Sequence, residues 1–336
     1  MTYVTLGKTG IRVNKNGFGA LPVQRASVEE AVAILQRAYE GGIRFFDTAR
    51  GYTDSEMKLG LALSAVRGDI YIATKSTAVT GEAMKDDLET SLELLKTDYV
   101  DLYQFHNATF VPRPGDGSGL YEAAMEAKAA GKIRHLGITS HRLNVAKEAI
   151  ESGLYETLQF PFCYLSGEQE MELVKMCEEA NMGFIAMKAL SGGLITRSDA
   201  AYAWLNQFPG VLPIWGVQKM TELEEFLALQ DDEPTVSGEI EELIRHDREE
   251  LAGDFCRGCG YCMPCPAGIV INNCARMSLL LRRAPTTNWL SETWQANMEK
   301  IEDCLHCGAC IKKCPYGLNT PALLRKNLED YKTFLK

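Results

Sequence analysis

The sequence has no long hydrophobic run, no excess of positive charge and no leader-like start, and each absence narrows the possible functions. No apolar stretch approaches the roughly 20 residues that cross a bilayer, so we expect no membrane partner. The formal net charge of −10 argues against a nucleic-acid partner. Residues 1–10 show no basic segment followed by an apolar one, so we expect a cytoplasmic protein rather than an exported one.

A nucleotide-binding glycine motif is also missing. No G-x-G-x-x-G opens a helix after a candidate strand, which argues against a doubly wound dinucleotide-binding fold. Hydrophobic residues nevertheless make up 46% of the 336 residues, an ordinary share for a globular protein. That length is sufficient for one large domain and a smaller one.

Cysteine, in contrast, is abundant, and eight of the 11 cysteines form two runs near the C-terminus. The runs are Cys256, Cys259, Cys262 and Cys265, then Cys304, Cys307, Cys310 and Cys314. The second reads C-x2-C-x2-C-x3-C and is followed by Pro315, a spacing typical of iron–sulfur ligation. Zinc is the alternative, but zinc would take two cysteine pairs per ion and needs no Cys-Pro ending. Disulfides are disfavoured in a chain without an export signal.

The cysteine pattern resembles the bacterial ferredoxin module that holds two [4Fe–4S] clusters. In that module the fourth cysteine of each run binds the other cluster. The resemblance therefore implies one cluster on Cys256, Cys259, Cys262 and Cys314, and another on Cys304, Cys307, Cys310 and Cys265. The first run departs from the module, because only two residues separate Cys262 from Cys265, where three are usual. The other three cysteines, Cys163, Cys177 and Cys274, are expected to be small buried apolar residues.

Upstream of the cysteine runs, strand patterns alternate with helical ones. After a hairpin over residues 3–13, strands are predicted at 17–20, 43–46, 70–73, 100–105, 133–138, 157–160, 183–187 and 211–215. Ser27 is predicted to cap a helix, with Glu30 completing a capping box. Eight alternating β and α units predict an α/β fold, a closed (β/α)8 TIM barrel. A doubly wound open sheet is the alternative.

A polar stretch that contains a proline, residues 231–238, predicts a domain boundary. We therefore expect a barrel domain over residues 1–232. A helical and ferredoxin-like domain over residues 233–336 would then hold the two clusters.

Four titratable residues follow three successive predicted strands. They are Asp47, Tyr52, Lys75 and His106, in the strings FFDTARGY, IATK and LYQFHN. In (β/α)8 barrels, catalytic groups stand at the C-terminal ends of the strands. Each residue alone would more often be a helix cap or a surface ion pair. Four at successive strand ends indicate a catalytic site.

These strings and the opening LGKTGIRV resemble the aldo/keto reductases over about residues 1–230, and the cysteine-rich tail resembles the ferredoxin-fused branch of that family. The resemblance implies an oxidoreductase that interconverts a carbonyl and an alcohol with NADP or NAD. It makes Tyr52 the general acid/base, with a pKa lowered by the Lys75 ammonium. Asp47 would hold Lys75, and His106 would orient the substrate oxygen.

The resemblance also implies a set of cofactor-binding residues. Thr139, Ser140 and Gln159 occupy the place of the segment that holds the nicotinamide amide, and Met187 stands where the family has a stacking tyrosine. Lys219 is the only cation in the segment that matches the family's adenosine-phosphate site. The complete expected set is Gly19, Ala20, Thr139, Ser140, Gln159, Met187, Lys188, Gly216, Gln218, Lys219 and Glu224.

The combination of the two halves leaves three functional hypotheses, because a nicotinamide transfers a hydride whereas a [4Fe–4S] cluster passes single electrons. In the first, the barrel is an ordinary nicotinamide enzyme and the clusters are structural or redox-sensing. In the second, the clusters feed single electrons to the barrel, through a flavin or the substrate. In the third, the barrel is inactive and the protein transfers electrons to a redox partner protein. The substrate in the first two would be a small carbonyl or alcohol.

Overall fold

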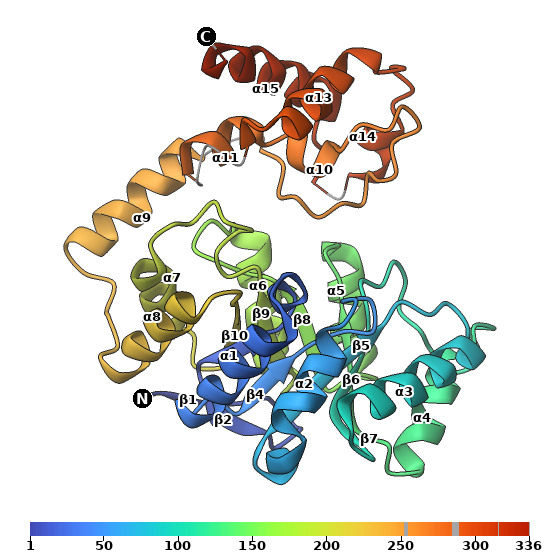
Figure 1. The fold of residues 1–336 in the computed structure, drawn as a ribbon. Helices are drawn as coiled ribbons and strands as arrows, with labels where there is room; N and C mark the ends of the chain where they lie inside the picture. Colours follow the sequence, from blue (N-terminus) through green and yellow to red (C-terminus); the bar gives the residue numbers. More distant parts are fainter. Residues whose placement is uncertain (252–254, 284–288, 315, 336) are drawn as a thin grey trace. The chain divides into compact units, whose positions relative to one another are not determined.

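The computed structural model describes residues 1–251, 255–283, 289–314 and 316–335 (Figure 1). Pro315, which follows the second cysteine run, lies outside the described residues. The chain divides into two compact units, the first formed by residues 1–189 and 199–237 and the second by residues 190–198 and 238–336. In the described part of the chain, no helix has both the length and the apolar character needed to span a membrane.

The first unit is a barrel. In residues 1–251, which the structure describes without a gap, eight parallel strands close in the order β10-β3-β4-β5-β6-β7-β8-β9 (Figure 1). This confirms the predicted (β/α)8 fold rather than a doubly wound open sheet. The strands are β3 (Gly17–Gly19), β4 (Phe45–Asp47), β5 (Tyr71–Ser76), β6 (Val100–Phe105), β7 (Ile133–Thr139), β8 (Thr157–Pro161), β9 (Gly183–Met187) and β10 (Val211–Gly216).

Helices follow the strands along the chain. They are α1 (Val28–Glu40), α2 (Ser55–Leu63), α3 (Gly81–Leu95), α4 (Leu120–Ala129), α5 (Leu143–Ser152), α6 (Glu168–Glu179), α7 (Ser198–Asn206) and α8 (Met220–Asp231). The predicted capping box is present at α1. The Ser27 hydroxyl accepts from the Glu30 amide at 3.2 Å, and the Glu30 carboxylate accepts from the Ser27 amide at 3.0 Å. These bonds satisfy two amides that the helix itself cannot pair.

A short hairpin packs at the end of the barrel where the strands begin. Strands β1 (Tyr3–Thr5) and β2 (Arg12–Asn14) pair antiparallel, as the sequence predicts. Buried side chains of this hairpin, including Val4 and Val13, belong to one core cluster with barrel residues such as Ala73 and Leu102. Chemistry is therefore expected at the opposite end, where the strands finish.

Helix α2 is a barrel helix that the sequence patterns do not predict. It follows directly after the loop that carries Tyr52, and its Ser55 hydroxyl donates to the Ala20 carbonyl at 2.9 Å. Gly60 lies against α3, where an added Cβ would stand 2.1 Å from the carbonyl oxygen of Leu94. The absence of a side chain at Gly60 allows the two helices to approach closely and so fixes the loop that precedes α2.

The second unit is helical around the cysteine loops. Its described helices are α9 (Glu239–Glu250), α10 (Ile271–Cys274), α11 (Met277–Arg283), α13 (Glu292–Glu299), the 3-10 helix η3 (Lys300–Asp303), α14 (Ala309–Lys313) and α15 (Thr320–Phe334). Buried residues of α10, α11, α13 and α15 form one apolar cluster, to which several cluster-motif cysteines are packed. Tyr331 on α15 ties this core together by donating to the Trp289 carbonyl at 2.7 Å.

We predict that Gly60→Ala destabilises the barrel by about 1–3 kcal/mol or more, because the new methyl group would collide with backbone. Gly68→Ala is the matched control, since a Cβ at Gly68 meets nothing within 4 Å. Urea unfolding followed by circular dichroism measures both. Equal midpoints for the two variants would show that α2 and α3 do not approach as described.

Candidate active site and cluster cavities

A buried ion pair lies at the C-terminal ends of β4 and β5. The Lys75 ammonium donates to the Asp47 carboxylate and to the Thr48 carbonyl, both at 2.6 Å. Lys75 is 1% exposed and Asp47 2% exposed. Burial acts to lower the pKa of Lys75, but Asp47 and Tyr52 outweigh it and raise this pKa above its ordinary 10.5. Lys75 is therefore a permanent positive charge at neutral pH.

Tyr52 lies beside this charge. The Lys75 ammonium is 5.0 Å from the centroid of the Tyr52 ring, and the ring is partly exposed. Burial raises the pKa of Tyr52 above its ordinary value of 10, while the Lys75 ammonium opposes this rise. The sequence analysis predicted that Lys75 lowers the pKa of Tyr52, and the lysine does act in that direction. The prediction of a lowered net pKa is wrong, because desolvation of the phenolate is the larger effect.

His106 completes the group of four. Its ring packs edge-on against the Tyr52 ring, with centroids 5.6 Å apart. Burial, reinforced by the positive charge of Lys75, lowers the pKa of His106 to about 3. Its buried Nδ1 has no hydrogen-bond partner among the described residues. His106 is therefore a neutral imidazole that can donate or accept a hydrogen bond but does not carry a charge.

Two amide side chains support Asp47 from inside the barrel. Gln104 donates to the Gln159 oxygen at 2.9 Å. Burial raises the pKa of Asp47, and the Lys75 ammonium and these two amides act against that rise. The sequence analysis did not single out Gln104. Its signal is a polar residue inside VDLYQF, a strand whose side chains are otherwise mostly apolar and all buried.

Most of the expected cofactor residues also lie at the ends of barrel strands. Gly19 and Gly216 are paired across β3 and β10, and Thr139 and Gln159 across β7 and β8. Ala20, next to Gly19, donates its amide to the Asp47 carbonyl at 2.8 Å. The fold thus brings these five residues to one edge of the barrel.

Several of the expected cofactor side chains already take part in local hydrogen bonds. The Thr139 hydroxyl accepts from the Asn107 amide at 2.7 Å, and the Ser140 hydroxyl donates to the Ala108 carbonyl at 2.9 Å. The Thr139 hydroxyl keeps its own proton available for a ligand. Gln159 is different, because its amide is engaged with Gln104 and Asp47.

The remaining expected cofactor residues lie at the end of β9, between β10 and α8, and on α8. Met187 ends β9, and Lys188 follows it in a left-handed conformation with φ 55°. The amides of Gln218 and Lys219 both donate to the Glu222 carboxylate, at 2.8 and 3.0 Å. The Glu224 carboxylate instead accepts two bonds from Arg37 on α1, at 2.8 and 2.9 Å.

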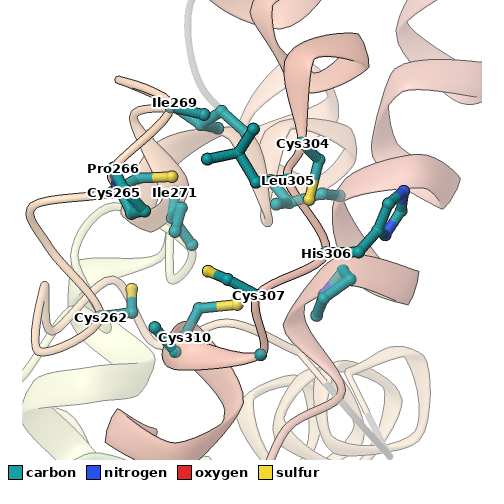
Figure 2. A pocket seen from close by; sticks show the side chains of 15 residues that line it. Cys262, Cys265, Pro266, Ile269, Ile271, Cys304, Leu305, His306, Cys307 and Cys310 are labelled. Atoms are coloured by element: carbon teal, nitrogen blue, oxygen red, sulfur yellow. The ribbon is translucent and has the colours of Figure 1, made fainter.

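The eight motif cysteines of the second unit surround two cavities. One, of about 350 Å³, is lined by Cys256, Cys259, Cys262 and Cys314. The other, of about 410 Å³, is lined by Cys265, Cys304, Cys307 and Cys310, with Cys262 also on its wall. In Figure 2 the sulfurs of this second group point toward the space between them, and the His306 ring points away. We call these the first and the second cavity.

The two cavities fit iron–sulfur cubes better than single metal ions. Among the described residues, no three His, Cys, Asp or Glu side chains converge as they would on one ion. The thiols stand instead around a space, with apolar residues such as Ile271 between them. Each cavity combines three cysteines of one run with the fourth of the other, which is the grouping that the ferredoxin resemblance implies. The individual ligands stay predictions.

Comparison with known families finds one match for the barrel and another for the cysteine-rich part of the chain. The profile of the aldo/keto reductase family matches residues 15–202, and that of a 4Fe-4S dicluster domain matches residues 255–319. The first match covers the barrel from β3 into α7, and the second covers both cysteine runs.

Individual relatives resemble the barrel. The chain is 30% identical over 212 residues to L-galactose dehydrogenase of Arabidopsis thaliana, and 30% identical over 206 residues to an uncharacterized oxidoreductase of Bacillus subtilis. Each match covers 57% of this chain and 66% of the relative, just under two thirds.

Solved structures share the barrel fold. An aldo-keto reductase from Bacillus halodurans in its holo form matches with a TM-score of 0.65 and 23% identity, covering 74% of this chain and 96% of that one. An aldo-keto reductase from Klebsiella pneumoniae in complex with NADPH matches with a TM-score of 0.62 and 24% identity, covering 74% and 94%. At this identity the likeness concerns the fold.

We predict that Cys256→Ser and Cys304→Ser each lower the iron content from about eight to about four atoms per chain, because each removes a corner ligand from one cube. Iron analysis and the visible absorption of anaerobically purified protein measure this loss. Cys163→Ser is the control, since that buried cysteine belongs to the barrel unit.

Replacement of the fourth cysteines tests the grouping of the ligands. Cys314→Ser should alter the same electron paramagnetic resonance (EPR) signal as Cys256→Ser, and Cys265→Ser the same signal as Cys304→Ser. The reverse pairing would show that each run binds its own cube.

Proposed function

Because the chain belongs to the aldo/keto reductase family, we propose that its barrel interconverts a carbonyl and an alcohol, with Tyr52 as the general acid of reduction and general base of oxidation. One observation carries this proposal: the Lys75 ammonium, held by Asp47, lies 5.0 Å from the ring of Tyr52. A phenol beside a fixed cation, at the catalytic end of a (β/α)8 barrel, is suited to give up and recover a proton.

The burial of Tyr52 and the charge of Lys75 have separate roles in this reaction. A raised pKa keeps the phenol protonated at neutral pH, so the proton is present when a carbonyl oxygen gains negative charge. Once the proton has moved, the Lys75 ammonium stabilises the phenolate that remains. Asp47 and the two amides behind it keep the ammonium in position. A positioned acid of this kind contributes about 10²- to 10⁴-fold to the rate.

His106 orients the substrate rather than moving the proton. With a pKa lowered to about 3, its imidazole is neutral in the working range and is a poor proton donor in comparison with its charged form. A neutral ring next to Tyr52 can hydrogen-bond the carbonyl oxygen. The oxygen would then be shared between His106 and Tyr52, and this sharing fixes the face of the carbonyl that is reduced.

The strand-end residues fit a bound nicotinamide dinucleotide, NAD or NADP, which when present supplies the hydride. Gly19 and Gly216 pair where β3 meets β10 and add no side chain to that edge, and Thr139 retains a hydroxyl proton for the carboxamide. Ser140, Met187 and Lys188 are proposed to complete this part.

Three other residues of the expected set have more limited roles. Gln159 is engaged with Asp47, so we propose that it supports the catalytic lysine instead of the cofactor. The amides of Gln218 and Lys219 already bind the carboxylate of Glu222. A 2′-phosphate would therefore meet a negative charge beside the single cation of that segment.

We predict that Tyr52→Phe lowers kcat for carbonyl reduction by about 10²- to 10⁴-fold, because the substituted ring keeps the shape and loses the proton. Tyr71→Phe is the matched control: Tyr71 lies at the start of β5, the strand that ends with Lys75 and Ser76. Steady-state rates with NADH and NADPH and a panel of small aldehydes measure both. Unchanged activity in Tyr52→Phe would favour the hypothesis of an electron-transfer protein with an inactive barrel.

The pH dependence of reduction should show a single alkaline loss. Reduction needs the protonated phenol, and burial places the pKa of Tyr52 above 10, so kcat/KM should fall only above about pH 10 while alcohol oxidation rises. His106, with a pKa of about 3, should contribute no step between about pH 5 and 8. A step near pH 6.5 that disappears in His106→Gln would contradict the neutral-imidazole role.

A further inference from the structure

Arg276 is a half-buried cation of the second unit that the reaction described above does not use. It stands immediately before α11, and its guanidinium lies between two glycine backbones. An added Cβ at Gly258 would meet its Cζ at 2.9 Å, and one at Gly192 would meet its Nη1 at 3.0 Å. Both glycines have positive φ, 65° and 64°. Backbone therefore approaches the guanidinium at both positions without an intervening side chain.

The hydrogen bonds of Arg276 are incomplete. Nη2 donates to the Gly192 carbonyl at 3.3 Å, while the buried Nε and Nη1 have no partner among the described residues. Burial lowers the pKa of Arg276 and its interaction with Cys256 raises it, although a guanidinium stays charged throughout. A charged donor that is buried without an acceptor destabilises the structure. An anion next to Arg276 in the loaded protein would satisfy these two donors.

The cluster expected in the first cavity would supply this anion. Gly258 belongs to the turn between Cys256 and Cys259, two of the cysteines that line that cavity. The Gly258 amide itself donates to the Cys256 sulfur at 3.4 Å, so the turn that packs on Arg276 also holds a sulfur of this cavity. A [4Fe–4S] cube with four thiolates is negatively charged, and one-electron reduction adds one more negative charge without making or breaking a bond.

The second cavity differs in charge and exposure. Arg257 lines the first cavity and lies 4.5 Å from the centroid of the Tyr316 ring, and Arg276 packs on the Cys256–Cys259 turn beside it. Among the described residues that line the second cavity there is no lysine or arginine. Its Cys307 is exposed, as is Leu305 at 65%. Net charge, hydrogen bonds to sulfur and solvent exposure set cluster potentials, so the two cubes cannot be electronically equivalent.

We propose that Arg276 donates its free N–H groups to the iron–sulfur cluster of the first cavity and gives this cluster the higher reduction potential of the two. A fixed positive charge and N–H donors stabilise the reduced cube more than the oxidised one, because the reduced cube carries the greater negative charge. An electron that reaches either cluster would then reside mainly on the cluster beside Arg276, which has the higher potential. The inference does not depend on the chemistry of Tyr52.

The test is a potentiometric titration of the fully loaded protein with dithionite, followed by EPR. Cys256→Ser and Cys304→Ser proteins assign the two signals. In Arg276→Gln, the ratio of reduced to oxidised first cluster at a fixed potential should fall about tenfold, which is 59 mV for a one-electron couple. Arg276→Lys should recover most of this shift because it restores the charge. The second cluster should move much less.

Arg282→Gln is the matched control, since Arg282 lies on α11 and carries the same charge but is bound to Asp330 at 2.5 Å. It should leave both potentials unchanged. An unchanged first cluster in Arg276→Gln, or equal shifts of both clusters, would overturn the proposal.

A second measurement covers the case in which Arg276→Gln loses iron. Protein labelled with ¹⁵N-arginine should show a nitrogen coupling to the reduced first cluster in pulsed EPR, and Arg276→Lys should remove it. A coupling that persists in Arg276→Lys would belong to another arginine, such as Arg257, and would refute the assignment to Arg276.

Discussion

The barrel depends on one buried ion pair, that of Lys75 with Asp47. Removing one partner of such a pair leaves an uncompensated charge in the interior, at a cost of about 3–5 kcal/mol. The Thr48 carbonyl and the amides of Gln104 and Gln159 act against the desolvation of the two groups, although burial still raises the pKa of Asp47. The positions of β4, β5, β6 and β8 are therefore tied to one charge, and the acid–base chemistry proposed for Tyr52 depends on that charge.

The second unit uses charge in another way. In the barrel, a cation and an anion are both supplied by the protein. At the first cavity the protein supplies the cation Arg276, and the cluster would supply the anion. The chain thus joins an aldo/keto reductase barrel to a 4Fe-4S dicluster domain. An unequal pair of clusters would allow the domain to hold one electron at a defined place.

Sequence patterns predicted the barrel well because its strands are short apolar runs between helices with regular spacing. They failed at α2, whose charged Glu56 and Lys58 break the apolar face. Both are buried because tertiary partners satisfy them: Glu56 accepts from Thr74 at 2.6 Å, and Lys58 donates to the Val23 carbonyl at 3.0 Å. The net pKa of Tyr52 and the surroundings of Arg276 depend likewise on burial, which local sequence does not encode.

The place of Gly258 has a consequence for variation of the domain. The space that a side chain would need there is already taken by the guanidinium of Arg276, and the backbone has a φ that disfavours other residues. Any larger residue would push the arginine away from the cysteine turn. A single methyl group, at a position without chemistry of its own, would then change the electron affinity of the neighbouring metal centre. Homologues that replace this glycine would be expected to have altered the arginine as well.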